Sequence, residues 1–177
     1  MRKLTLILII VFISFSFYSI QKQTENNKTD KPTIDNEFTI NDDYYNLHFS
    51  VENKANQKPI LVIVIELKKD AHYISPFAKL DFTGKFYMDL GSYKDVDFKS
   101  EIIETPRSEE TYNNAGHPVN LIHINTTYRQ ELNIKTLQNF EVFGRVRFTI
   151  EPRCTLEEHP FMISFKDGKY EISSPKC

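Results

Sequence analysis

The two cysteines are the residues of this sequence best suited to chemistry. Cys154 and Cys177 close a loop of 23 residues near the carboxyl end of the 177-residue chain. A permanent bond between them would contribute roughly 3 kcal/mol to stability by restricting the unfolded chain. A thiol that exchanges with the disulfides of other proteins would instead need a second thiol to resolve the mixed disulfide. The spacing is consistent both with a structural staple and with a redox-active Cys154 that Cys177 resolves.

The elements around the cysteines bear on this choice. Asp167-Gly168 predicts a two-residue hairpin turn, because both residues tolerate the positive φ angles of a type I′ turn. The register of that hairpin, when extended, places Cys177 opposite Glu158. A bond to Cys154 therefore requires a tight bend over residues 154–160, and Pro152 and Pro160, which bracket that segment, favour one. The sequence predicts this bend and a Cys154–Cys177 disulfide.

The other residue types narrow the range of functions. No histidine pair has a metal-ligand spacing, and the sequence has neither a Gly-x-Ser-x-Gly elbow nor a glycine-rich phosphate loop. We therefore expect no metal and no cofactor, and we interpret Glu157-Glu158 as a solvated turn. The net charge is −2 without a basic stripe, so nucleic acid is not an expected partner. The five histidines are His48, His72, His117, His123 and His159.

The amino terminus has the layout of an export signal. A basic start, Met1-Arg2-Lys3, precedes an apolar run over residues 4–20, and a polar stretch follows. We expect a cleaved signal peptide or an uncleaved membrane anchor at 1–20, a disordered linker at 21–36 and one domain at 37–177. The predicted location is the periplasm or cell envelope, where disulfide bonds can persist.

The domain sequence predicts an all-β sandwich of about seven to nine strands, because short alternating segments are separated by turn signals. Alternating apolar residues from Tyr45 onward indicate a half-buried strand, and Ile60–Leu67 is apolar enough for a central strand covered on both faces. The less regular candidates are strands at 80–90 (with Gly84 as a bulge), 96–103 and 119–127, a turn at 113–118 and one helical turn within 129–139.

The clearest strand signal covers residues 140–151. Apolar residues occupy every second position, so we expect Val146 to face the core and Arg147 to face solvent. The hairpin that follows should pair Ile163 with Ile172. The predicted inward face consists of Val142, Gly144, Val146, Phe148 and Ile150, and the outward face of Glu141, Phe143, Arg145, Arg147 and Thr149.

The landmarks of the chain resemble those of a known family. Residues 143–148 (FGRVRF), Cys154 and residues 160–165 (PFMISF) are similar, in this order, to the amino-terminal periplasmic domain of the thiol:disulfide interchange reductase DsbD. Upstream, residues 70–76 (DAHYISP) and 104–106 (ETP) resemble further segments of that domain. The resemblance implies an immunoglobulin-like fold and a place outside the cytoplasm.

The sequence also departs from the pattern of that family. The family's redox turn carries two cysteines a few residues apart, whereas this chain has Cys154 alone, with Thr149 or Ile150 at the place of the other cysteine. Ala71 replaces the tryptophan that precedes the equivalent of His72. Because the redox pair is incomplete, we do not expect the chain to be an enzyme on its own.

Two hypotheses for function remain open at this point. In the first, which the resemblance implies, the domain interacts with thioredoxin-like or other thiol oxidoreductases through Cys154, and Arg153 is the neighbouring cation that could favour its thiolate. In the second, the domain is a non-enzymatic binding or structural sandwich, and Cys154 and Cys177 form a permanent bond. The reduction potential of the pair separates the two hypotheses.

Overall fold

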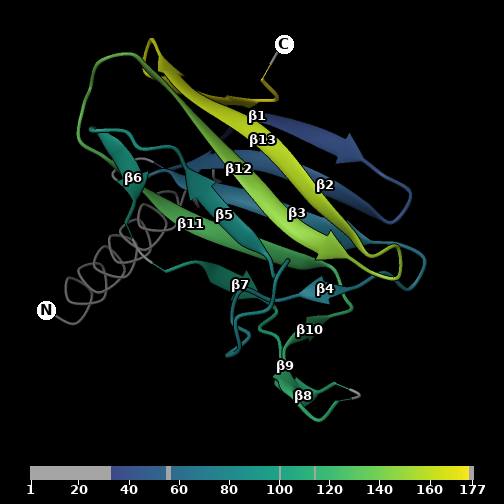
Figure 1. Ribbon diagram of the computed structural model, residues 1–177. Coiled ribbons are helices and arrows are strands. Elements are labelled where there is room, and N and C mark those ends of the chain that lie inside the picture. Colours follow the sequence, from purple (N-terminus) through teal and green to yellow (C-terminus); the bar gives the residue numbers. More distant parts are fainter. Residues whose placement is uncertain (1–32, 55–56, 100, 114, 176–177) are drawn as a thin grey trace, which may run out of the picture. The chain divides into compact units, whose positions relative to one another are not determined.

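The computed structural model describes residues 33–175, with the exception of 55–56, 100 and 114 (Figure 1). Every helix or strand element in this part of the chain is a β-strand. Within the same residues, no helix is long and apolar enough to cross a membrane. The predicted signal or anchor at 1–20 lies outside the described residues, as does the predicted linker up to residue 32.

The first sheet contains six strands. They are β1 (Thr33–Asn41), β2 (Tyr45–Asn53), β3 (Ile60–Leu67), β6 (Val96–Phe98), β7 (Ile103–Thr105) and β11 (Thr126–Ile134). Their order across the sheet is β1-β2-β3-β11-β6, with β7 also pairing with β11, and all pairs are antiparallel. Because β1 begins at Thr33, the sandwich starts within the range predicted as linker.

The second sheet contains four strands in the order β14-β13-β12-β5. They are β5 (Tyr87–Leu90), β12 (Phe140–Ile150), β13 (Thr155–Lys166) and β14 (Lys169–Ser173). In Figure 1, β5, β12 and β13 lie in front of the first sheet. Two short antiparallel pairs accompany the sheets: β4 (Tyr73–Ile74) with β10 (Leu121–Ile122), and β8 (Thr111–Tyr112) with β9 (Pro118–Val119).

The two main sheets have the strand order of an immunoglobulin domain. β2, β3, β11 and β6 correspond to its A-B-E-D sheet, and β13, β12 and β5 to its G-F-C sheet. The predicted all-β, immunoglobulin-like sandwich is thus confirmed. The described residues contain fourteen strands instead of seven to nine, because several predicted strands are divided into short pieces and β1 adds a strand at the edge of the first sheet.

The core lies between the facing sheets and follows the predicted alternation. The inward residues of β2 and β12 are buried, with Val146 and Phe148 fully inaccessible, whereas Arg147 is partly exposed. Gly144 is required at its position, because a Cβ there would overlap the Phe161 ring and the Asp89 carbonyl. β3 is central in its sheet as predicted, although its second face is only partly covered.

The terminal hairpin also has the predicted register. Lys166 pairs with Lys169 and Ile163 with Ile172, so the turn consists of two residues. Both turn residues have positive φ angles, 52° for Asp167 and 80° for Gly168, as a type I′ turn requires.

Several predictions for the middle of the chain are wrong. Only Tyr87–Leu90 of the segment 80–90 is a strand. Gly84 lies in a turn with a φ of 85° and its carbonyl accepts the N–H of Thr149 at 2.7 Å, so it is not a bulge. The predicted strands at 96–103 and 119–127 are each interrupted, and the predicted helical turn within 129–139 falls largely in β11. The turn at 113–118 is confirmed, since it joins β8 to β9.

Candidate functional site at the β12–β13 turn

Cys154 occupies the last position of the turn that joins β12 to β13. Ile150 pairs with Thr155 at the end of the hairpin, so residues 151–154 form the connection. Cys154 has a φ of 56°, a left-handed conformation that residues other than glycine adopt uncommonly. The residue is exposed. The turn therefore presents the sulfur to solvent at the tip of a hairpin whose β12 arm is 11 residues long.

Glu151 ties the first residue of this turn to another part of the chain. Its N–H donates to the carbonyl of His72 at 2.9 Å, and its carbonyl accepts the N–H of His72 at 3.1 Å. The hairpin is thereby anchored to the segment that follows β3. This isolated bridge lies outside the named strands, and it limits how far the turn can move relative to the sandwich.

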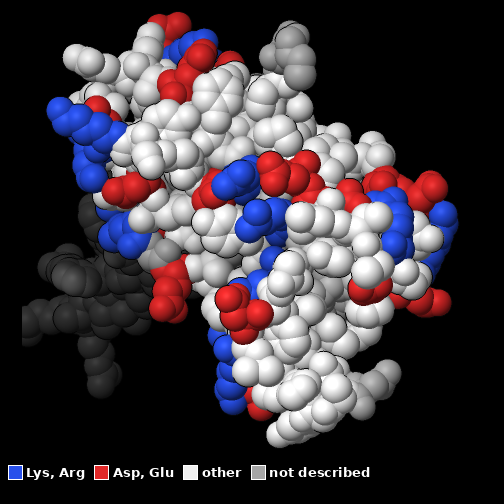
Figure 2. Space-filling view, viewed as in Figure 1, with Lys and Arg blue, Asp and Glu red and all other residues white. Residues whose placement is uncertain are grey.

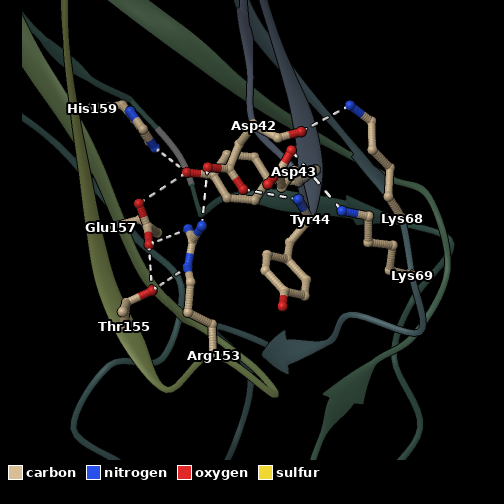
Figure 3. Close-up of polar contacts among 10 residues, drawn as sticks. Asp42, Asp43, Tyr44, Lys68, Lys69, Arg153, Thr155, Glu157 and His159 are labelled. Carbon is tan, nitrogen blue, oxygen red and sulfur yellow. Dashed lines mark hydrogen bonds and ion pairs between the residues drawn. The ribbon is translucent and has the colours of Figure 1, made fainter.

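Arg153 anchors the turn on its other side (Figure 3). Its guanidinium donates to Asp42 at 3.1 Å and to Glu157 at 2.6 Å, and its Nε donates to the Thr155 hydroxyl at 2.7 Å. The guanidinium also lies 5.1 Å from the centre of the Tyr44 ring. The hydrogen bonds to the two carboxylates raise the pKa of Arg153 further above its ordinary value. The side chain is a charged link between the β1–β2 turn and β13.

Tyr45 completes this cluster from inside the sandwich. Its hydroxyl lies 3.0 Å from a carboxylate oxygen of Glu157 and 2.8 Å from Nε2 of His159. Burial, and then the negative charge of Glu157, raise the pKa of Tyr45. Burial also lowers the pKa of His159, even though two nearby carboxylates act in the opposite direction. Tyr45 and His159 are therefore neutral near pH 7.

Glu157 is the acceptor at the centre of the cluster. Burial by itself would raise its pKa, but the hydrogen bonds from Thr155, Arg153 and Tyr45 outweigh burial and hold the pKa below its ordinary value. The interpretation of Glu157-Glu158 as a solvated turn is wrong, because both residues lie in β13. Glu157 points inward and is partly buried, whereas Glu158 is exposed. Alternation along β13 separates the two neighbours onto opposite faces of the sheet.

The β1–β2 turn is held from a third direction. Lys68 donates to the carbonyl of Asp42 at 2.9 Å and to the side chain of Asn46 at 2.5 Å. Lys69 lies 4.0 Å from Asp43 and 5.5 Å from the Tyr44 ring centre. Figure 3 shows these lysines opposite Arg153 across the turn. The cluster therefore joins the start of β2, the end of β3 and the β12–β13 turn.

The side chains of this cluster hold the turn in position, and their positive and negative charges compensate one another. The hydrogen bonds of Arg153 go to Thr155 and the two carboxylates, and none of those found among the described residues goes to Cys154. Asp42 is among the acceptors, and its pKa is also lowered: burial opposes this, but the hydrogen bonds from Tyr44 and Arg153 prevail. The cluster consequently fixes the backbone on both sides of the cysteine.

The bend that was expected to bring the two cysteines together is absent from the described residues. Residues 155–160 are extended and pair with β12, from Thr155 opposite Ile150 to Pro160 opposite Arg145. Pro160 lies within this regular ladder, whereas Pro152 lies in the turn before β13. Cys177 lies outside the described residues, and so does the Cys154–Cys177 disulfide that the sequence predicts.

The histidines do not form one site. The rings of His72 and His123 lie 4.8 Å apart, whereas His48 is beside Glu66 at 3.2 Å and His159 belongs to the cluster around Tyr45. Burial, and then His72, lower the pKa of His123. In the part of the chain that the structure describes, no group of three or more His, Cys, Asp or Glu is placed to hold a metal ion.

Sequence reasoning missed the cluster that holds the turn. Its members come from distant parts of the chain: Tyr45 and His159 are 114 residues apart, and Asp42 and Arg153 are 111 residues apart. No local spacing marks such a set. The available signal was the position of Glu157 and His159 on the inward side of an alternating strand, where polar side chains need partners.

Comparison with known proteins adds no assignment, since neither a family model nor a curated protein matches the sequence.

Proposed function

We propose that this chain is an exported immunoglobulin-like module that forms mixed disulfides with thiol oxidoreductases through Cys154. The observation that carries the proposal is the exposed Cys154 at the tip of the β12–β13 hairpin, with both sides of the turn anchored. A thiol that another protein must reach needs exposure and a fixed approach, and this turn provides both. The family resemblance of the sequence supports the same type of partner.

The chemistry is an exchange between one thiol and one disulfide. The Cys154 thiolate attacks one sulfur of the partner's disulfide, a new bond forms between the two sulfurs, and the partner's second cysteine leaves as a thiolate. That thiolate, or another thiol of the same compartment, later reverses the step. No net oxidation of this chain results unless a second thiol, for which Cys177 is the candidate, displaces the partner and leaves a Cys154–Cys177 bond.

A defined partner tests the proposal. We expect a Cys177→Ser chain to form a covalent adduct with a thioredoxin that retains only its attacking cysteine, activated beforehand as a thiopyridyl disulfide. Formation of the adduct would be followed by release of pyridine-2-thione and by mass spectrometry of the unreduced product. A Cys154→Ser chain that retains Cys177 is the matched control, and it should form little adduct. Absence of the adduct would exclude Cys154 as the exchanging group, and equal yield from both chains would show that the turn gives Cys154 no advantage over Cys177.

The state of the cysteines in the exported protein tests the alternative of a permanent staple. The extended course of residues 155–160 favours two unbonded thiols. We expect two free thiols per chain when the protein is denatured without a reductant and titrated. A count of zero in protein whose mass is lower than that of the reduced chain by two hydrogen atoms would assign a structural disulfide and favour a non-enzymatic binding or structural sandwich.

Export itself is part of the proposal. Residues 1–20 should be absent from the mature protein or should hold it at a membrane, because a basic start followed by an apolar run directs secretion. Cell fractionation with mass spectrometry of the amino terminus measures this. Full-length protein that stays in the cytoplasmic fraction would contradict the predicted location in the periplasm or cell envelope.

A further inference from the structure

The outer face of the second sheet carries an apolar hollow near the Cys154 turn. The hollow has a volume of about 400 Å³ and lies among Tyr87 of β5, Arg147 of β12 and Leu156 of β13, with the loop 81–85 alongside. Tyr87 and Leu156 are large apolar side chains that are 44% and 57% exposed. Figure 2 shows this face of the molecule, with charged side chains among uncharged ones.

The charged side chains that line this hollow sum to one positive charge, because Asp81 is negative and Lys85 and Arg147 are positive. Lys85 and Asp81 lie 4.0 Å apart and compensate each other. Arg147 lies over the Tyr87 ring at 5.5 Å and forms no ion pair among the described residues, since Glu158, which is opposite it in the β12–β13 register, pairs with Arg145. Its neighbour Arg145 differs, because Asp89 at 3.2 Å and Glu158 at 3.8 Å compensate it. The hollow therefore offers an unpaired positive charge beside apolar surface.

The hollow lies within reach of a peptide that is bonded to Cys154. Leu156 is two residues beyond Cys154, and an extended peptide covers about 3.3 Å per residue. A chain of only a few residues therefore spans from a sulfur bonded to Cys154 to a side chain seated in the hollow. An acidic group would pair with Arg147, and an apolar group would cover Tyr87 and Leu156.

We propose that this hollow binds the segment that flanks the redox cysteine of the oxidoreductase, and that this segment carries a carboxylate next to an apolar side chain. The inference rests on the proposed exchange at Cys154 and adds the chemistry by which the partner is selected. The charge of Arg147 selects the acidic group, and the exposed faces of Tyr87 and Leu156 accept the apolar one.

Thiopyridyl-activated peptides test the inference. The sequences Asp-Phe-Cys-Phe-Asp, Lys-Phe-Cys-Phe-Lys and Asp-Gly-Cys-Gly-Asp are symmetric about the cysteine, so the direction of binding does not affect the comparison. Each reacts when the Cys154 thiolate attacks the peptide sulfur, its bond to the pyridyl sulfur breaks, and pyridine-2-thione leaves. All chains carry Cys177→Ser, and 2,2′-dithiodipyridine, which is neutral, measures the intrinsic reactivity of the thiol.

We expect the Asp-Phe peptide to react about threefold or more faster than the Lys-Phe peptide. The net charge of the whole chain, −2, would by itself favour the lysine peptide, so this preference would report the local field of Arg147. Arg147→Gln should abolish the preference. Arg129→Gln makes the same charge change on β11 of the other sheet and should leave it intact.

Leu156→Ala should likewise reduce the ratio of the reaction rate of the Asp-Phe peptide to that of the Asp-Gly peptide. Leu137→Ala, at a position that is 94% exposed and outside the strands, is its control.

Each outcome has a distinct meaning. Equal rates for all peptides, or a preference that persists in Arg147→Gln, would overturn the docking inference while leaving exchange at Cys154 in place. No release from any peptide would overturn both proposals. Self-association of the unmodified chain that Leu156→Ala abolishes would assign the hollow to a second copy of this chain and would also overturn the inference.

Discussion

The hairpins at the two ends of the domain and the segment between them are stabilised in different ways. The terminal hairpins, β1 to β3 and β12 to β14, consist mainly of long strands whose alternate side chains enter the core. The middle segment, residues 68–125, contains strands of two to four residues, and its backbone turns around buried polar groups. Glu104 is 5% exposed there, and its carboxylate accepts hydrogen bonds from Ser75 at 2.7 Å and from the N–H of Ser108 at 2.8 Å.

The difference shows where a single residue matters most. In the long hairpins, the backbone groups pair with each other and many apolar residues contribute to the core. Only a drastic change at one position, such as a buried charge, therefore unfolds the domain. In the middle segment, one carboxylate satisfies donors from several turns at once. Loss of that carboxylate leaves these donors buried without a partner.

The largest expected effect is on the terminal hairpins. Val146→Asp should unfold the domain, because Val146 is fully buried and an unpaired carboxylate in that place costs several kcal/mol, comparable to the whole stability of a domain. Arg147→Asp, on the outward face of the same strand, is the matched control and should be mild. Thermal unfolding of the two variants measures the contrast, and equal shifts would contradict the assignment of faces.

A smaller loss is expected in the middle segment. Glu104→Ala should lower the free energy of unfolding by about 2 to 4 kcal/mol, since buried donors lose their acceptor. Glu104→Gln keeps the shape and one acceptor oxygen, so it should lose less than the alanine variant. Urea denaturation measures both values. If the two variants were equally stable, the hydrogen bonds of Glu104 would not account for its burial.

Substitutions of two buried tyrosines, one in contact with each region, allow the stabilities of the two regions to be compared directly. Tyr128 lies 3.0 Å from Glu104 and Tyr45 lies 3.0 Å from Glu157, and both rings are fully buried. Tyr128→Phe should cost about 1.5 to 3 kcal/mol, because its hydrogen-bond partner Glu104 is buried. Tyr45→Phe should cost about 1 kcal/mol or less, since Glu157 keeps its bonds from Arg153 and Thr155. The reverse order in denaturant titrations would contradict the comparison.

The smallest expected effect depends on pH. Burial lowers the pKa of His159 in the folded protein, whereas in the unfolded chain the histidine protonates near its ordinary value of 6.5. The unfolded state therefore binds more protons as the pH falls, so the stability that neutral His159 contributes is present above about pH 6.5 and is lost below it. His159→Asn should reduce the fall in urea midpoint between about pH 7 and about pH 5.5, while His123, whose pKa is also lowered, maintains part of the slope. An unchanged pH dependence in His159→Asn would show that the residue is not held neutral.

The same contrast explains how far the sequence predicts the structure. The faces of β12, the buried side of β2 and the register of the Asp167-Gly168 hairpin follow from period-two alternation and from one turn motif, and all are confirmed. The strands between residues 80 and 127 were misjudged because their lengths depend on contacts with distant residues, such as the hydrogen bond from Thr149 to the carbonyl of Gly84. Alternation carries no information about such contacts.

The candidate site was predictable only in part. The sequence singled out Cys154 and its neighbour Arg153, and it placed the cysteine in a turn. It did not indicate that Asp42 and Glu157 would bind Arg153, because nothing in the local pattern near residue 42 specifies a partner 111 residues away. The two prolines suggested a bend after Cys154, but strand pairing with β12 overrides that preference.

The distance along the chain between Asp42 and Arg153 has a consequence for the order of folding. The β12–β13 hairpin is a local structure that can form early, whereas a contact across 111 residues requires the closure of a long loop and forms once the sheets have docked. During folding, Cys154 would thus exist first in a turn whose anchors to the β1–β2 turn and to His72 are not yet made. A folding chain passes through a stage in which the thiol of Cys154 meets other thiols without the orientation that the folded domain imposes, and rapid docking of the two sheets shortens that stage.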